Sequence, residues 1–196
     1  MILLDPDLDP DSSPPGHAHD RGDPDSRPHS GMASPVAAWG RGFLPWAQRL
    51  PTSRTLTRFL AQAKAAARVV GEVNVLLTTD RAMRRMNRQF RGKDKPTDVL
   101  SFPASPVAQD RGKFAGDMAI SVDTARRQGT ARGHSLGVEL KVLMLHGLLH
   151  LAGYDHESDE GRMARHERRL RARLGLPQGL IERTNQRSHE TRSRKS

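Results

Sequence analysis

One stretch, HGLLHLAGYDH at residues 146–156, constrains the local fold more than any other part of the chain. His146 and His150 are four residues apart, so in a helix their side chains lie on the same face, one turn apart. Gly153 can adopt a positive φ and turn the chain back, which would bring His156 toward the same point. The stretch therefore predicts a long helix, a glycine turn and three imidazoles around one metal ion.

The three histidines predict a catalytic rather than a structural metal site. Three neutral imidazoles and one open position are typical of catalytic zinc, whereas structural zinc is usually held by four protein ligands. We therefore predict one Zn²⁺ per chain, although nickel, copper or iron would also accept imidazole. The predicted metal ligands are His146, His150 and His156.

Gly147 occupies the position at which zinc proteases of this spacing carry their catalytic glutamate. Glycine cannot act as a base, and we expect its missing side chain to leave open space beside the ion. This substitution disfavours ordinary peptide hydrolysis. It favours a bulky anionic substrate, such as a phosphodiester, which a carboxylate would repel.

The charge of the chain is unevenly distributed. The net charge is +10, and residues 53–183 contain 24 Lys and Arg against 14 Asp and Glu, whereas residues 1–52 contain seven Asp and four Arg. A basic domain attracts polyanions, with nucleic acid or ribosomal RNA as the first candidates. An arginine-rich proteome would produce the same balance without such a partner.

Composition also excludes several classes of protein. The absence of cysteine rules out a disulfide framework and thiolate ligands, and it fits a reducing compartment. No apolar run approaches the roughly 18 residues of a membrane-spanning helix. The start, MILLDPDLDPD, lacks the basic segment of a signal peptide.

The composition divides the chain into three parts. Residues 1–52 are predicted to be a disordered, acidic, Pro- and Asp-rich extension and linker, because they hold too little apolar surface to offset ordering entropy. The aromatic residues within 37–52 would either dock on the domain or belong to an irregular linker. Residues 53–183 are predicted to fold, and residues 184–196 to form a basic flexible tail.

Helical and strand patterns mix within the predicted domain. Helical spacing of apolar residues predicts helices over 55–70, 81–90, 123–128, 135–152 and 158–175. Short apolar runs predict strands over 72–79, 99–104 and 117–122, and Asp80 and Asp123 are predicted helix caps. This mixture predicts an α+β fold resembling an α/β sandwich. A small mixed sheet would carry packed helices, with the zinc site on the long helix and the turn after it.

A second informative stretch is RQFRGKDKPTDVLSF, residues 88–102. Arg91 is predicted to lie where a helix ends, just before Gly92. An arginine held at such a junction can bind two phosphate oxygens at once. The alternative is an ordinary exposed charged face.

Three blocks, RGKDKPTDVLSFP, AGDMAIS and HGLLHLAGYDH, together resemble the YbeY family of bacterial zinc-dependent endoribonucleases, which mature ribosomal RNA. The resemblance covers about residues 53–180. It implies that His146, His150 and His156 bind zinc and that Arg91 lies in the RNA cleft. Two features depart from the family pattern. No convincing strand precedes the first helix within 37–52, and the acidic extension, which could compete with RNA or be inert, is additional.

Several other residues match the family signature. Thr97, Asp98 and Ser101 fit the family signature, and Asp98 would either hydrogen-bond a ligand histidine or cap its own loop. Gly116 and Asp117 are expected to be structural. Asp155 would orient a histidine, accept a proton or form a turn.

The resemblance implies a single-strand-specific endoribonuclease that acts in 16S rRNA 3′-end maturation and ribosome quality control. Its expected partners are single-stranded RNA and the ribosome or ribosomal proteins, and its expected location is the cytoplasm. The predicted catalytic residues are His146, through the metal, and Arg91, which would stabilise the charge developing at phosphorus. A zinc-bound water with a pKa of about 7 would need no strong protein base, consistent with Gly147.

Two alternatives use the same residues differently. The first is a zinc-stabilised rRNA- or ribosome-binding assembly factor with little catalytic activity of its own. The second is a metallohydrolase of peptides or small molecules, which would leave the basic surface unexplained.

Overall fold

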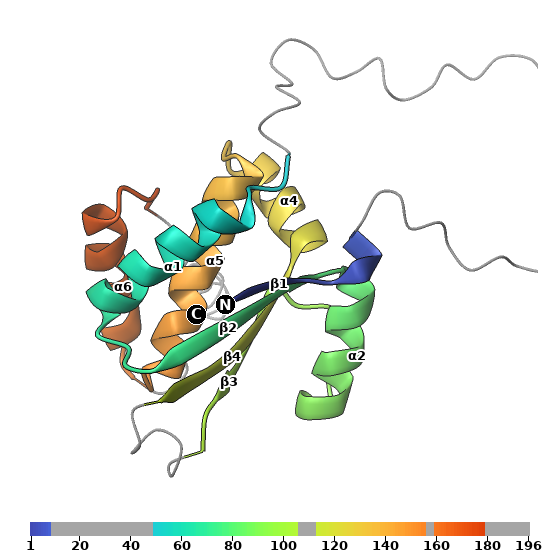
Figure 1. Ribbon diagram of the computed structural model, residues 1–196, viewed down its shortest axis with the longest axis horizontal. Coiled ribbons are helices and arrows are strands. Elements are labelled where there is room, and N and C mark those ends of the chain that lie inside the picture. Colours follow the sequence, from blue (N-terminus) through green and yellow to red (C-terminus); the bar gives the residue numbers. More distant parts are fainter. Residues whose placement is uncertain (9–48, 106–112, 156–158, 179–196) are drawn as a thin grey trace, which may run out of the picture.

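The computed structural model describes residues 1–8, 49–105, 113–155 and 159–178. A four-stranded sheet of order β1-β2-β4-β3 lies at its centre (Figure 1). β2 pairs in parallel with both β1 and β4, whereas β3 runs antiparallel to β4 at the sheet edge. The strands are β1 (Ile2–Leu4), β2 (Glu72–Thr78), β3 (Val99–Pro103) and β4 (Phe114–Ser121).

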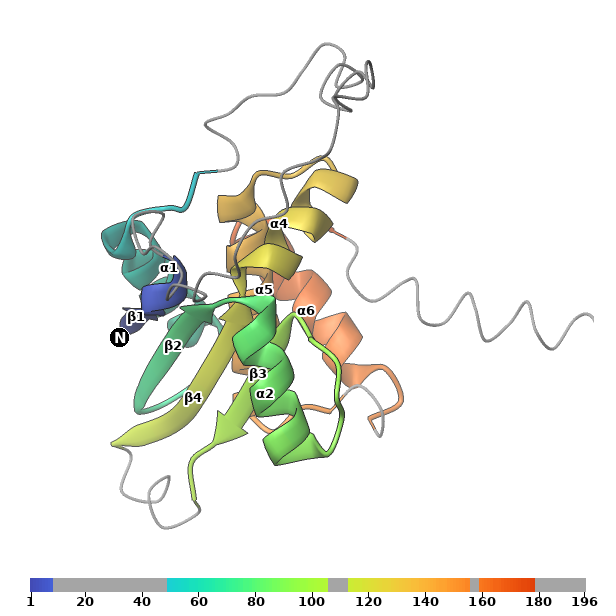
Figure 2. The ribbon, with the colours of Figure 1, turned by 90° about the vertical axis from the view of Figure 1, so that its right-hand side faces the viewer.

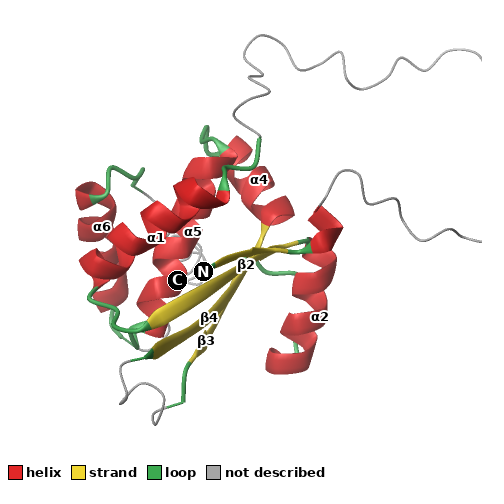
Figure 3. Cartoon of the chain, in the orientation of Figure 1, coloured by secondary structure: helices red, strands yellow, loops and turns green. Residues whose placement is uncertain are grey.

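Helices cover both faces of this sheet. They are α1 (Ser53–Ala67), α2 (Asp80–Arg91), α4 (Val122–Ala131), α5 (Leu136–Leu151) and α6 (Arg162–Arg173), with a 3-10 turn, η1, at Pro6–Leu8. Helices α1, α5 and α6 lie on one side, and α2 lies on the other (Figures 1 and 3). Figure 2, viewed from the α2 side, shows α2 in front of the sheet. The mixed sheet with packed helices confirms the predicted α+β fold. No described helix is long and apolar enough to cross a membrane.

The main core lies between the sheet and α5. Val73, Val75 and Leu77 alternate along β2 and contribute to this core, as the period of a strand requires. Helix α5 is buried on almost every side, with eleven of its 16 residues buried. Such a helix is held on all sides, so its side chains keep fixed positions. A second, smaller core of Met83, Leu100 and Ala119 lies beneath α2.

The start of the chain departs from the predicted disorder. Ile2–Leu4 forms β1, the Met1 amine donates to the Val73 carbonyl oxygen at 2.6 Å, and Asp5 N–H donates to the Leu77 carbonyl oxygen at 2.9 Å. Residues 2–4 thus supply an edge strand before the first helix, where the sequence pattern indicated none. Three apolar residues are enough to form this strand, because β2 offers a complete row of backbone hydrogen-bonding partners. Residues 9–48 and the tail, 184–196, lie outside the described residues.

The predicted caps Asp80 and Asp123 are wrong by one or two residues. The Thr79 hydroxyl caps α2 by accepting from Ala82 N–H at 3.3 Å, and the Ser121 hydroxyl caps α4 by accepting from Thr124 N–H at 3.0 Å. Both hydroxyls follow a strand in extended backbone, the conformation of an N-cap. The two aspartates lie inside the first turns and connect the helices to each other.

Candidate metal centre

His146 and His150 meet on one face of α5, as their spacing predicts. Their Nε2 atoms are 3.2 Å apart, and the rings are inclined at 76°. Two unprotonated ring nitrogens so close repel each other unless a proton or a cation lies between them. Tetrahedral zinc with Zn–N bonds of 2.0–2.1 Å would hold two nitrogens about 3.4 Å apart, so this pair fits one metal ion.

The third predicted ligand, His156, lies outside the described residues. Among the residues that are described, no group of three His, Cys, Asp or Glu side chains is arranged to hold a metal. His146 and His150 are therefore the two described ligands of the three predicted, and the participation of His156 stays a prediction.

Glu167 of α6 fixes the orientation of His146. The His146 Nδ1 atom is 3.1 Å from a Glu167 carboxylate oxygen, and Glu167 is only 1% exposed. When Nδ1–H donates to this carboxylate, the lone pair on Nε2 is left to bind a metal. The other Glu167 oxygen is paired with the buried guanidinium of Arg171.

The charge of Glu167 is maintained despite burial. Burial by itself raises the pKa of this carboxyl, but the hydrogen bond from His146 and the charge and hydrogen bond of Arg171 outweigh it, and the pKa is lowered. Glu167 is thus an anion at neutral pH and can only accept hydrogen bonds. Sequence reasoning missed this residue. Its signal was a carboxylate within the stripe Met163, Glu167, Leu170, where a charge needs a buried partner.

The chain turns sharply after α5, as predicted. Gly153 has a φ of +85°, its N–H donates to the His150 carbonyl oxygen at 3.0 Å, and Tyr154 N–H donates to the Leu149 carbonyl oxygen at 3.0 Å. The turn carries Tyr154 to α6, where its ring stacks on His166 at 5.1 Å between centroids. Asp155 is exposed at the end of this turn, and its role stays a prediction.

Gly147 does not open space beside the metal site, so that expectation is wrong. A Cβ atom at this position would lie 3.2 Å from both Ser101 Oγ and Met118 Sδ, which are side chains of the sheet. The Ser101 hydroxyl also donates to the Gly147 carbonyl oxygen at 3.2 Å. The glycine thus allows α5 to approach β3 and β4 closely, and a glutamate here would have to fit within the contact between helix and sheet.

Asp98 anchors its own loop. Its carboxylate accepts from Val99 N–H at 2.9 Å and from the Gln128 side-chain amide at 3.1 Å. This supports the loop-capping alternative, and the role of histidine partner belongs to Glu167. Gly116 is structural, as expected, because a Cβ atom there would lie 2.4 Å from the Phe102 carbonyl oxygen.

Arg91 is the last residue of α2 and is exposed, with Gly92 ending the helix at a φ of +67°. Its neighbour Phe90 packs edge-to-face against Phe102 of β3 at 5.0 Å. The end of α2 therefore lies against the same edge strand whose Ser101 contacts α5, but from the opposite face of the sheet. Arg91 belongs to α2 and the two histidines belong to α5, on opposite faces of the sheet, so the catalytic role of Arg91 stays a prediction.

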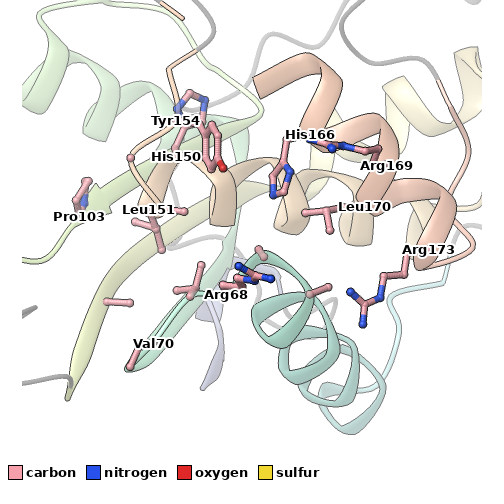
Figure 4. A pocket seen from close by; sticks show the side chains of 16 residues that line it. Arg68, Val70, Pro103, His150, Leu151, Tyr154, His166, Arg169, Leu170 and Arg173 are labelled. Carbon is pink, nitrogen blue, oxygen red and sulfur yellow. The ribbon is translucent and has the colours of Figure 1, made fainter. Parts of the chain in front are cut away.

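A cavity of about 870 Å³ adjoins the metal centre, with His150 among its lining residues (Figure 4). It lies where the ends of α1, α5 and α6 meet, and its lining includes Arg68, Arg169, Arg173 and His166. Burial lowers the pKa of His166, and the positive charges of Arg169 and Arg68 lower it further. We call this cavity the basic pocket.

Comparison with known proteins adds independent information. Residues 48–175 match the family described as "Endoribonuclease YbeY". An "Endoribonuclease YbeY" of Koribacter versatilis is 49% identical over 144 residues, which are 74% of this chain and 91% of that protein. Its counterpart in Solibacter usitatus is 54% identical over 110 residues, 56% of this chain and 71% of that protein. A Thermotoga maritima protein of known solution structure aligns with a TM-score of 0.46 at 26% identity, over 64% of this chain and 85% of that one.

Proposed function

Because this chain belongs to the endoribonuclease YbeY family, we propose that it is a zinc-dependent endoribonuclease, a hydrolase of phosphodiester bonds in single-stranded RNA. Its proposed role is 16S rRNA 3′-end maturation and ribosome quality control. The observation that carries the proposal is the convergence of two Nε2 atoms, one of them on a histidine anchored by an anionic carboxylate.

Each described residue of the centre has a defined task in this proposal. His146 and His150 bind the ion through Nε2, and Glu167 holds the proton of His146 on Nδ1. The Gly153 turn directs the following chain back, with His156 as the proposed third ligand. A divalent ion held there supplies a Lewis acid for a phosphoryl oxygen or a water molecule.

Arg91 is the proposed second catalytic residue. Its guanidinium would stabilise the negative charge that develops on the phosphoryl oxygens during cleavage. Arg91 lies on the α2 face of the sheet and the histidines lie on the α5 face. The RNA would therefore have to cross the β3 edge to contact both. The Arg84 guanidinium on the same helix is already bound to both oxygens of Asp94, at 2.9 and 2.7 Å, and is less available.

The proposed setting follows from charge and composition. The basic domain would attract rRNA and bring the protein to the ribosome or to ribosomal proteins. A chain without cysteine needs no oxidising compartment, consistent with a cytoplasmic location.

The proposal is tested with protein purified without added metal. Its metal content is measured, and cleavage of a single-stranded 16S rRNA 3′ fragment is compared among wild type, His146→Ala, Arg91→Ala and the control Arg85→Ala. We expect about one zinc per chain in wild type, loss of metal and cleavage in His146→Ala, and loss of cleavage alone in Arg91→Ala. Arg85 is exposed on the same helix, so its variant should cleave normally.

Two results would contradict the proposal. Undiminished cleavage by metal-free His146→Ala protein would exclude the metal centre from the chemistry. Tight zinc binding and RNA binding without cleavage by wild type would instead indicate a zinc-stabilised assembly factor.

A further inference from the structure

The basic pocket concentrates positive charge without a compensating carboxylate. Arg68 comes from the end of α1, and Arg169 and Arg173 come from successive turns of α6 (Figure 4). No acidic residue is among the described residues that line the pocket, and none of these three arginines forms an ion pair with a described carboxylate. By contrast, the buried arginine of α6, Arg171, is paired with Glu167.

These guanidinium groups act on the same space. Arg68 and Arg169 line one pocket from different helices. Burial lowers the pKa of His166 there, and the charges of Arg169 and Arg68 lower it further. His166 therefore stays neutral at neutral pH, which leaves the arginines as the cations of the pocket. Side chains of like charge held close together favour an anion between them, and a guanidinium fork matches the oxygens of a phosphate.

The pocket also offers a flat surface. Tyr154 and His166 stack with an angle of 16° between their rings, and both side chains remain partly exposed. Apolar side chains complete the lining, among them Ala67, Leu151 and Leu170. Aromatic rings beside cationic side chains are the combination on which proteins bind single-stranded nucleic acid, because every base has a face that can stack.

The position of the pocket relates it to the metal centre. His150 lies in its lining, and Tyr154 follows that histidine after the Gly153 turn. A ligand in the pocket would therefore lie beside His150, one of the proposed metal ligands. A volume of about 870 Å³ is also within the range of about 300–1,000 Å³ typical of small-ligand sites.

We propose that the basic pocket binds the nucleotide of single-stranded RNA that adjoins the cleaved bond. Its phosphate lies on Arg68, Arg169 and Arg173, and its base stacks on the Tyr154–His166 pair. This inference rests on the proposed endoribonuclease function, and it adds a reason for single-strand specificity. A base can stack on these rings only if it is not already paired and stacked in a duplex.

The phosphate interaction is tested by binding of a 2′-O-methylated single-stranded RNA, recovered afterwards to check that it is intact, at several salt concentrations. The variant Arg169→Gln/Arg173→Gln is compared with Arg162→Gln/Arg165→Gln, which removes the same charge from positions of the same helix outside the pocket. Loss of the contact to one phosphate should reduce the slope of log K against log salt by about 0.7. We expect this reduction in the pocket variant only, together with a higher KM and an unchanged kcat in cleavage assays.

The stacking interaction is tested with Tyr154→Leu and Tyr154→Phe. Removal of the ring should weaken RNA binding about 5- to 100-fold, whereas the phenylalanine variant should bind like wild type. Zinc content should be unchanged in all four variants.

The outcomes separate this inference from the proposed function. Cleavage by wild type, with equal affinity and salt slope in the pocket and control variants, would overturn the pocket assignment and leave the endoribonuclease. Pocket-dependent RNA binding without cleavage by wild type would support the RNA pocket and contradict the nuclease. Equal weakening by the pocket and control variants would indicate general charge attraction and would also overturn the assignment.

Discussion

At the scale of single residues, the described part of the chain holds two buried carboxylates that each contact a histidine. Glu167 contacts His146 and the guanidinium of Arg171, and Glu139 of α5 contacts His134 and the guanidinium of Arg132. Both carboxylates are at most 1% exposed. Removing one partner of such a buried pair costs about 3–5 kcal/mol, because the other charge stays behind. Of these two carboxylates, only Glu167 adjoins the metal centre. Glu139 is equally buried but has no part in that centre.

Glu167→Gln should lower zinc affinity about 10- to 100-fold, the usual effect of removing a carboxylate that orients a metal-binding histidine. Glu139→Gln is the control, because it lies two turns from His146, about 10 Å along α5. Both variants should unfold at lower temperature, but only Glu167→Gln should lose zinc in a competition titration with a chelator. Equal zinc affinities in the two variants would contradict the assigned role.

At the scale of elements, α2 and α4 are joined at their N-termini. The Asp123 carboxylate accepts from Asp80 N–H at 2.9 Å, and the Asp80 carboxylate accepts from the hydroxyls of Ser121 and Thr124 and pairs with Arg127. Burial raises the pKa of Asp80, but the three side-chain hydrogen bonds and the charge of Arg127 outweigh it, so the pKa falls below 3.8. These contacts favour the ionised carboxylate in the folded state.

This junction predicts an acid-dependent loss of stability. The unfolded chain binds a proton at Asp80 at higher pH than the folded chain does, so stability rises with pH across this window. The Asp80 contribution is therefore complete above pH 3.8 and is lost as pH falls through the lowered, folded-state pKa. The free energy of unfolding is measured by urea titration at neutral pH and below pH 3.8. Its change between the two should be smaller in Asp80→Asn than in wild type. The control is Asp94→Asn, which removes the exposed ion pair with Arg84. It should alter the pH dependence of stability less than Asp80→Asn does. Identical pH profiles for wild type and Asp80→Asn would contradict the prediction.

At the scale of the whole molecule, the first residues close one edge of the sheet. At least three backbone hydrogen bonds join residues 1–5 to β2, and Ile2 packs against the main core. Without them, β2 would present an unpaired edge, which favours aggregation.

A protein lacking residues 1–8 should be less stable by roughly 3 kcal/mol, at about 1 kcal/mol for each hydrogen bond removed. It should also associate, which light scattering would detect alongside thermal unfolding. A protein lacking residues 184–196, the predicted flexible tail, is the control and should match the full chain. If both truncated proteins unfold at the same temperature and associate to the same extent, β1 contributes little to stability or to protection of the sheet edge.

The sequence by itself determined the features that a local period encodes. Four-residue spacing placed His146 and His150 together because the helix repeats every 3.6 residues. Alternation identified β2, and Gly153 identified the turn because few other residues accept its φ. The main helices, three of the four strands and the pair of histidines in the metal centre follow from such short-range rules.

Only the tertiary structure decided which distant segments meet. Glu167 reaches His146 from 21 residues away, β1 pairs with a strand more than 70 residues later, and Gly147 is fixed by the sheet beneath it. The basic pocket likewise combines the ends of α1, α5 and α6. Such contacts depend on how buried faces pack against one another, and no spacing along a single segment records which faces will meet.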